Sequence, residues 1–388
     1  MKIASIRAAA VSDPRLWSDP DAPLREWNKG TNSTNPLSRY RELLGQGHRF
    51  QTPWSMVVCV VEATDGTFGV GVSSHAGPVV PIINDYFAPM LEGESVFATE
   101  FLWNMMVRGS AAKMGAAGVA SYAISAVDLA LWDLKGKLLG RPVYELVGGP
   151  ARSSIHCYAT GHDIDWYREL GFEAIKLCAL EGAASPTASL EGTVEMVAGF
   201  RDQLGADFDL MIDLWPVHDP LFTIELGSRL APYNLRWLED YLHPEDFVGY
   251  QRVRQRLPTQ SLAAGERWYT DRPFANAARD HWVDVFQPDV QWVGGATAVL
   301  KIAAIADAAG IELALHAGCN DPYGQHLCAA LPGNRWGEFY VHSAPGVPLD
   351  NGYRNVPGMA VPRDGKLVVS DAPGFGIELT LEMIESAT

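Results

Sequence analysis

Short apolar runs alternate with helical patterns between Ser154 and about residue 345. The runs read "SIHCYAT", "FEAIKLCA", "DLMIDLW", "LRWLEDY", "SLAAGE", "VDVFQPD", "IELALHA" and "EFYVHS". Continuous apolar strands separated by helices are typical of a parallel sheet that is buried on both faces. Eight such units predict an α/β fold of the (β/α)8 type, a modified TIM barrel. The alternative is an open doubly wound sheet, but no Gly-x-Gly-x-x-Gly follows a first strand.

The region before the barrel has a different pattern. Residues 1–10 alternate as a strand does, and 54–74 predict a hairpin that turns at Thr64-Asp65-Gly66. Helical patterns follow over about 92–140, so we expect a small α+β capping domain. After about residue 345 the chain becomes loop-like, and no barrel strand is left for "APGFGIELT" to join, so this tail is expected to return to the N-terminal domain. The predicted units are an N-terminal capping domain (1–125), a barrel (126–345) and a returning C-terminal segment (346–388).

Composition narrows the possible partners. The net charge of −16 disfavours nucleic acid and anionic membrane surfaces as partners. No run approaches the length of a membrane span, and the N-terminus lacks the apolar core of a signal peptide. The five cysteines include no Cys-x-x-Cys pair, which favours buried thiols in a reducing compartment. A cytoplasmic location is therefore expected.

Polar residues stand at the C-terminal ends of six successive predicted strands. They are Asp213, Glu239, Glu266, Asp289, His316 and Glu338. Their separations are 26, 27, 23, 27 and 22 residues, about one strand–helix unit each. A single acid at a strand end is most often a helix cap or part of a loop ion pair. Six in consecutive register are instead expected to converge at the C-terminal mouth of a barrel, where the active sites of this fold lie.

The first three of these residues predict a metal site. Asp213, Glu239 and Glu266 offer oxygen ligands only, which suits Mg²⁺ far better than Zn²⁺. A cation would also compensate the charge of carboxylates that follow apolar strands.

The last three residues predict acid–base chemistry. Asp289 and His316 fall on adjacent strands, and a carboxylate bonded to one imidazole nitrogen raises the basicity of the other. A histidine in this position could also be a satisfied core residue, but its pairing with Asp289 favours a general base. Glu338 could donate a hydrogen bond to a developing oxyanion if its surroundings keep it protonated.

These motifs also carry a family resemblance. "AVDLALWDLKGKLLGRPVYELVGG", "MIDLW", "WLED", "GER", "QPDVQWVGGAT" and "PGFGIEL" resemble the mandelate racemase type of the enolase superfamily over nearly the whole chain. "PLSRYREL", "APYNLRWLEDYL" and the Asp-x-Trp of the third strand look most like L-rhamnonate dehydratases and related acid-sugar dehydratases. The resemblance implies Mg²⁺ bound by the three carboxylates, a His316–Asp289 base dyad and Glu338 near the enolate oxygen.

The resemblance also implies that loops of the capping domain recognise the far end of the substrate. Here these loops would be 14–36 and 45–53. His48 and Arg49 would either bind anionic or hydroxyl groups of the substrate or face solvent as an exposed pair. Trp215 is expected to form a wall of the pocket. Arg267, directly after the third carboxylate, would contact substrate or hold the neighbouring carboxylate.

One departure from the family bears on the reaction. Many relatives carry Lys-x-Lys at the end of strand two, whereas this chain has Cys178 in place of the second lysine. Cys178 could be a packed thiol or a surrogate base. Racemisation needs a base on each face of the substrate, so the sequence favours a reaction that needs only His316. The expected activity is Mg²⁺-dependent dehydration of a sugar acid, a small molecule, to a 2-keto-3-deoxy acid.

Other functions remain open. An epimerase or cycloisomerase would use the same metal and dyad, and a non-catalytic sugar-acid-binding relative is a further alternative. A homo-oligomer is expected because such barrels usually assemble.

Overall fold

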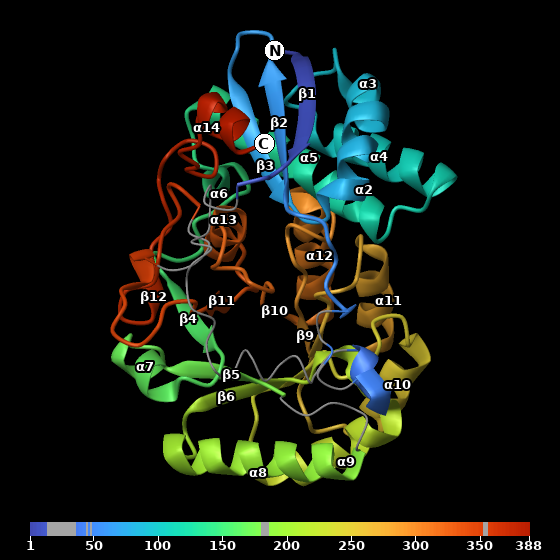
Figure 1. The fold of residues 1–388 in the computed structure, drawn as a ribbon, viewed down its shortest axis with the longest axis vertical. Helices are drawn as coiled ribbons and strands as arrows, with labels where there is room; N and C mark the ends of the chain where they lie inside the picture. Colours follow the sequence, from blue (N-terminus) through green and yellow to red (C-terminus); the bar gives the residue numbers. More distant parts are fainter. Residues whose placement is uncertain (14–35, 44–45, 47–48, 180–185, 352–355) are drawn as a thin grey trace.

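The computed structural model describes residues 1–13, 36–43, 46, 49–179, 186–351 and 356–388. Figure 1 shows a β-sheet with helices in the upper part of the molecule and a larger ring of strands and helices below it. Both chain ends lie in this upper part, the N-terminus at the top of the view and the C-terminus below it. The predicted (β/α)-barrel with a capping domain is confirmed.

The upper sheet is antiparallel and has the order β1-β2-β3. Its strands are β1 (Ile3–Ala10), β2 (Val57–Ala63) and β3 (Phe68–Ser73). β2 and β3 form the predicted hairpin. The long helix α5 (Val119–Leu139) packs against this sheet. A Cβ atom on Gly69 or Gly71 of β3 would lie only 2.1 or 1.9 Å from a carbonyl oxygen of α5, so these glycines allow the close contact.

Shorter helices complete the capping domain. They are α2 (Ala76–Pro81), the π-helical η6 (Ile82–Phe87), α3 (Ala88–Leu91), α4 (Thr99–Lys113) and α6 (Val143–Leu146). Two 3-10 helices, η3 (Pro36–Arg39) and η4 (Arg41–Leu43), precede the hairpin. α5 ends at Gly140 in the left-handed conformation, with φ of 63°, as its sequence predicts. Because α5 runs through residue 125 and contacts both β3 and the barrel helix α12, the position of the domain boundary stays a prediction.

Eight parallel strands form the barrel. They are β4 (Ile155–Thr160), β5 (Ala174–Cys178), β6 (Asp209–Asp213), β7 (Leu238–Glu239), β8 (Leu262–Ala264), β9 (Val285–Phe286), β10 (Glu312–Leu313) and β11 (Trp336–Tyr340). β11 pairs with β4, and a parallel bridge between Leu313 and Asn334 links β10 to the segment before β11. The ring is therefore closed, which excludes the open doubly wound sheet.

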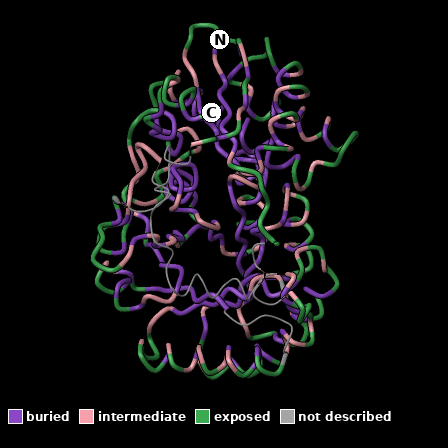
Figure 2. The backbone as a smooth tube through the Cα atoms, in the orientation of Figure 1, coloured by how far each residue is buried: buried purple, intermediate pink, exposed green. Residues whose placement is uncertain are grey.

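Helices alternate with the strands in the described part of the chain. They are α7 (Ile164–Glu169), α8 (Pro186–Leu204), α9 (Pro220–Leu230), α10 (Phe247–Arg256), α11 (Arg272–Asp280), α12 (Gly295–Ala309) and α13 (Pro322–Ala330). Two 3-10 turns flank α9, η7 (Trp215–Val217) and η8 (Ala231–Tyr233). Figure 2 shows buried positions along the barrel strands and exposed positions on the outer side of the helices, as at α8. None of the helices described is both long enough and apolar enough to cross a membrane.

The barrel interior is filled by a layer of apolar side chains. Its members come from successive strands or their immediate neighbours: Tyr158, Ala174, Met211, Trp237, Ala263, Val285 and Ala314, with Trp336 packed against them. The rings of Tyr158 and Trp237 meet edge to face at 5.7 Å. This layer closes the barrel core, so the charged residues that follow the strands gather at the C-terminal mouth.

The C-terminal tail joins both parts of the molecule. After η9 (Leu349–Asn351), β12 (Lys366–Leu367) pairs antiparallel with the start of β4. The amide of Phe375 then donates to Asp133 on α5, at 3.0 Å. Finally, α14 (Leu381–Ala387) reaches the N-terminal strand region, where Ser12 donates to the carbonyl of Ala387 at 2.8 Å. The tail thus returns from the barrel to the capping domain, as the sequence predicts.

Candidate active site

Three carboxylates stand side by side where consecutive strands end. Asp213 and Glu239 are the last residues of β6 and β7 and are direct neighbours across the sheet. Glu266 follows two residues after the end of β8. All three residues are buried, at 7, 1 and 3% exposure. The spacing in the sequence therefore predicted their common location correctly.

The predicted histidine–aspartate pair forms directly. Nδ1 of His316 lies 2.8 Å from Oδ2 of Asp289. On the other side of the ring, Nε2 lies 3.4 Å from Oε1 of Glu266. Burial works to lower the pKa of His316, but the negative charges of Glu266 and Asp289 outweigh it and raise the pKa to about 10. The imidazole is therefore held between the dyad partner and the third carboxylate.

A buried lysine, which sequence reasoning missed, lies at the centre of the mouth. Lys176 on β5 is 1% exposed and forms ion pairs with Glu239 and with Glu338, the latter at 2.7 Å. Burial opposes its charge, but the two carboxylates outweigh this and raise the pKa of Lys176 well above its usual value. The sequence feature that could have indicated Lys176 is a charged residue inside an apolar strand, one strand before the strand that ends at Asp213.

The structure corrects two expectations for Glu338. It is the third residue of β11 rather than a strand-end residue, although its side chain faces the mouth. It accepts hydrogen bonds from Thr160 Oγ1 at 2.5 Å and from the amide of Ala317 at 2.8 Å. Burial acts to raise the pKa of Glu338, but Lys176, His316 and the Thr160 hydroxyl lower it to about 2. The condition for a protonated Glu338 is therefore not met, because a buried ammonium group stabilises the carboxylate.

A second cation lies on the other side of the carboxylates. Arg267 pairs with Asp240 and, at 2.7 Å, with Oε2 of Glu266. Its guanidinium also lies 5.5 Å from the centre of the Trp215 ring. Of the two roles expected for Arg267, the contacts show the one that holds neighbouring carboxylates. Asp240, directly after Glu239, was not singled out in the sequence.

The two cations do not neutralise all the buried acids. Burial, together with Asp240 and Glu266, raises the pKa of Asp213 to about 7 against the effect of Lys176. Burial and neighbouring acids likewise raise the pKa of Glu239 to about 7. The mouth therefore has an excess of negative charge that a further cation would stabilise.

The donor set fits a hard cation, although the side chains are not closed around one. Within the described residues, no group of three acidic, histidine or cysteine side chains is arranged as a metal cage. Glu239 instead accepts from Lys176, Gln287 and Trp237, and Glu266 accepts from Arg267. Three adjacent carboxylates with excess negative charge are nevertheless the oxygen donors that Mg²⁺ prefers. Turning Glu239 and Glu266 away from their present partners would expose these oxygens to an ion.

The residues expected to contact substrate are only partly placed. Trp215 has φ of 49°, its amide donates to Oδ1 of Asp213 at 2.8 Å, and its ring lies 6.2 Å from that of Phe50. The segment around Phe50 therefore reaches the mouth. Arg49 is exposed, and no hydrogen bond or ion pair with another described residue places it at the site. His48 and nearly all of the 14–36 loop lie outside the described residues.

Cys178 ends β5 beside Asp213. Burial and the nearby carboxylate raise the pKa of its thiol well above the usual value. Because only the thiolate is a strong base or nucleophile, this environment favours a packed thiol. All five cysteines are buried and unpaired, as expected from the sequence.

Together, the capping domain, the closed ring of strands and the acid-rich mouth define a class: an enzyme of the capped (β/α)-barrel type. Comparison with known families agrees. The N-terminal domain of the mandelate racemase / muconate lactonizing enzyme family matches residues 49–148, and the enolase C-terminal domain-like family matches 162–383. The chain belongs to the mandelate racemase / muconate lactonizing enzyme family of the enolase superfamily.

Individual relatives are similar over their full length. The chain is 35% identical over 388 residues to the L-rhamnonate dehydratase of Saccharopolyspora erythraea, covering 99% of this chain and 98% of the relative. A crystal structure of rhamnonate dehydratase from Gibberella zeae, complexed with Mg, matches with a TM-score of 0.88 at 27% identity, covering 99% and 95% of the two chains. The 3,6-anhydro-D-galactonate cycloisomerase of Zobellia galactanivorans matches with a TM-score of 0.76 at 27% identity, covering 100% and 99%.

Proposed function

We propose that this protein is a Mg²⁺-dependent acid-sugar dehydratase that acts on a rhamnonate-like aldonic acid. The observation that carries this proposal is the His316–Asp289 pair, with an Nδ1–Oδ2 distance of 2.8 Å, facing the carboxylates from one side of the mouth. Cys178, which stands where many relatives have the second lysine of Lys-x-Lys, is buried with the pKa of its thiol raised well above the usual value and so favours a reaction with one base. The L-rhamnonate dehydratases among the relatives support the substrate class.

Asp213, Glu239 and Glu266 would hold the Mg²⁺ ion. When bound, the ion would supply positive charge that acidifies the proton next to the substrate carboxylate and stabilises the charge left by its removal. The same charge would take up the surplus negative charge of these buried acids. It would also weaken the effect of Glu266 on His316, so that the imidazole can lose its proton and act as a base.

His316 removes the proton at carbon 2 of the sugar acid. Asp289 holds Nδ1, which orients the ring and leaves Nε2 to accept the proton. The C3–O bond then breaks as a C2=C3 double bond forms, and the departing hydroxyl takes a proton and leaves as water. In a syn elimination His316 itself returns that proton. The enol product tautomerises to a 2-keto-3-deoxy acid.

Lys176 assumes the role first considered for Glu338. Its buried ammonium pairs with Glu239 and Glu338 and can donate its remaining proton to a substrate carboxylate oxygen. Glu338 then holds the lysine in place instead of contacting the oxyanion. Trp215 forms a wall of the site, Arg267 holds the acids beside it, and His48 and Arg49 remain candidates for contact with the far end of the substrate. A homo-oligomer likewise remains a prediction.

A panel of aldonic and aldaric acids, incubated with enzyme and Mg²⁺ and assayed for semicarbazide-reactive keto acids, tests this function. A 2-keto-3-deoxy acid should form from at least one aldonate and should be lost in His316→Asn. Full turnover by this variant would show that the base is wrongly assigned.

Similarity to a cycloisomerase favours a second candidate that uses the same residues. Products formed in D₂O distinguish the candidates. A dehydratase gives a keto acid, a cycloisomerase gives an isomer without loss of water, and an epimerase returns labelled substrate.

A further inference from the structure

The loop between β9 and α12 carries both Asp289 and Trp292. Asp289 binds His316, and the ring of Trp292 lies 5.1 Å from the imidazole. Within the loop, Oδ1 of Asp289 accepts from the amide of Gln291 at 2.7 Å, and its carbonyl accepts from Val293 at 2.9 Å. The position of this short loop therefore sets the position of the dyad.

On its outer side, the loop is bound by side chains of the capping domain. Ser73, at the end of β3, donates to the carbonyl of Gln291 at 2.6 Å. Ser121 on α5 donates to the carbonyl of Trp292, also at 2.6 Å. Trp103 on α4 donates through Nε1 to the carbonyl of Gly294 at 2.8 Å. Three capping elements therefore hold three nearby carbonyl groups of one barrel loop.

One face of α5 extends this contact. The residues involved are Ser121, Ser125, Asp128 and Trp132, spaced four, three and four apart, which places them on the same side of the helix. Ser125 accepts from the amide of Gly294 at 2.8 Å. Asp128 accepts from the amide and the hydroxyl of Thr297 at 2.9 and 2.7 Å, and Trp132 donates to the same hydroxyl at 2.9 Å. The start of α12 is thus bound to α5 as well.

Two glycines allow this approach. Gly294 and Gly295 have φ of 118° and 83°, which side chains disfavour. A Cβ atom on Gly295 would lie 2.5 Å from Oδ2 of Asp128. The backbone is therefore shaped to fit against α5, and the contact is specific to these residues.

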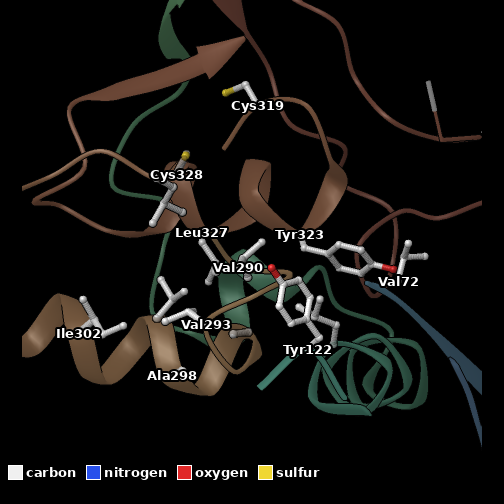
Figure 3. Close-up of a cluster of buried hydrophobic side chains, with 14 of the residues drawn as sticks. Val72, Tyr122, Val290, Val293, Ala298, Ile302, Cys319, Tyr323, Leu327 and Cys328 are labelled. Carbon is white, nitrogen blue, oxygen red and sulfur yellow. The ribbon is translucent and has the colours of Figure 1, made fainter. Parts of the chain in front are cut away.

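The side chains that hold the loop are buried, whereas the loop residues Gln291 and Trp292 are half-buried. Ser73, Ser121, Ser125 and Asp128 are all fully buried. Figure 3 shows the adjacent apolar cluster, which includes Val72 of β3, Tyr122 of α5, and Val290 and Val293 of the loop. Removal of one of these donors takes away the protein partner of a loop carbonyl, which favours a shift of the loop.

We propose that Ser73 and Ser121 are positioning residues that place the Asp289–His316 dyad for proton transfer. They act through the carbonyls of Gln291 and Trp292 and contact neither substrate nor metal. The capping domain then has a role in catalysis, because it determines the geometry of the general base. This inference rests on the proposed function in assigning proton abstraction to His316.

Ser73→Ala, Ser121→Ala and the double variant test the proposal, with Ser110→Ala as the matched control. Ser110 is a fully buried serine on α4 whose hydroxyl has no hydrogen-bond partner among the residues that the structure describes. We expect kcat to fall roughly tenfold in each single variant and about a hundredfold in the double variant, because small displacements of a base are costly. KM and the affinity for Mg²⁺ should stay unchanged, and Ser110→Ala should match the wild type.

The step affected is identified with substrate deuterated at carbon 2. The deuterium isotope effect on kcat should increase in the Ser73 and Ser121 variants, because proton abstraction becomes slower. Ser121→Thr retains the hydroxyl and should restore most of the activity. If the Ser73 and Ser121 variants melt at a lower temperature but keep the wild-type kcat per folded enzyme, the proposal is wrong. If the double variant does not fold, the single variants provide the same comparison.

A spectroscopic measurement separates this inference from the proposed function. The proton between His316 Nδ1 and Asp289 should give a downfield NMR signal that is missing in His316→Asn. It should shift or broaden in the Ser73 and Ser121 variants and remain unchanged in Ser110→Ala. If the wild type dehydrates no acid sugar, the proposed function is wrong, but the NMR signal still tests whether Ser73 and Ser121 position the dyad. An unchanged signal in the double variant would refute that positioning role.

Discussion

Buried carboxylates occur in two regions of this protein and have opposite surroundings. On α5, Asp128 and Asp133 are fully buried, and the groups that bond to them are neutral donors and Lys137. At the barrel mouth, Asp213, Glu239 and Glu266 are nearly as buried but lie beside other acids. Residue type and burial are therefore alike, and the identity of the neighbours is different.

The α5 carboxylates connect segments that are distant in sequence. Asp133 accepts from the amide of Val70 at 2.9 Å and of Phe375 at 3.0 Å, and it pairs with Lys137 at 2.7 Å. Asp133 thereby joins β3, α5 and the C-terminal tail. Its hydrogen bonds are complete without a ligand, so its role is to stabilise the fold.

The mouth carboxylates compete for too few cations. Lys176 pairs with two acids and Arg267 with two others, and the pKa of both Asp213 and Glu239 is still raised to about 7. Such an arrangement destabilises the protein on its own and favours cation binding. Burial raises the pKa of Asp128 to about 7 as well, so the mouth is distinguished by the several neighbouring acids that surround each carboxylate.

The largest expected effect is loss of turnover in Asp213→Asn. Removal of one proposed metal ligand should lower kcat by about 10³-fold and abolish the rise in melting temperature that Mg²⁺ gives the wild type. Without metal, this variant should be no less stable than the wild type because an uncompensated charge is gone. Calorimetry with and without Mg²⁺ checks both points. Retained stabilisation by Mg²⁺ would exclude Asp213 as a ligand.

Asp133→Ala should show the reverse pattern. The amides of Val70 and Phe375 lose their acceptor, so the free energy of unfolding should fall by about 3 kcal/mol. Turnover per folded molecule should stay near that of the wild type. Urea unfolding combined with kinetics at 15 °C measures both quantities. A large loss of kcat without loss of stability would contradict the structural role.

Asp128 should make stability depend on pH. Burial raises its pKa to about 7 although Thr297 donates two hydrogen bonds. The folded state therefore binds the proton more tightly than the unfolded state. The resulting stabilisation is complete below the unfolded pKa and is lost as the pH rises through 7. From pH 5 to 7 the loss should be about 2 kcal/mol, and Asp128→Asn should remove this part of the slope in unfolding experiments. An unchanged slope would contradict the assignment.

The smallest effect is expected for Cys178→Ala. A protonated, packed thiol contributes little to proton transfer, so kcat should change by less than about twofold. The product should also retain its configuration at the carbons beyond carbon 3. Steady-state kinetics with the true substrate checks this, alongside His316→Asn as the inactive reference. A loss as large as that of His316→Asn would identify Cys178 as a second base.

The sequence by itself determined the barrel and the location of its mouth. Each strand–helix unit has a similar length, so polar residues spaced by one unit must meet at the same edge of a closed parallel sheet. That reasoning brought Asp213, Glu239 and Glu266 together and paired His316 with Asp289. The ends of α5 and α12, at Gly140 and Gly310 in the left-handed conformation, depend on signals that are local to the chain.

Only the tertiary structure decided how these groups are charged and held. Lys176 reaches Glu338 because β5 and β11 both flank β4 in the closed ring, and this contact keeps Glu338 ionised. Ser121 meets the carbonyl of Trp292 from 171 residues away. Such contacts depend on the packing of segments that are distant in the sequence, so local sequence patterns do not predict them. The sequence therefore determines which acids meet, while the packing around them determines their charge and orientation.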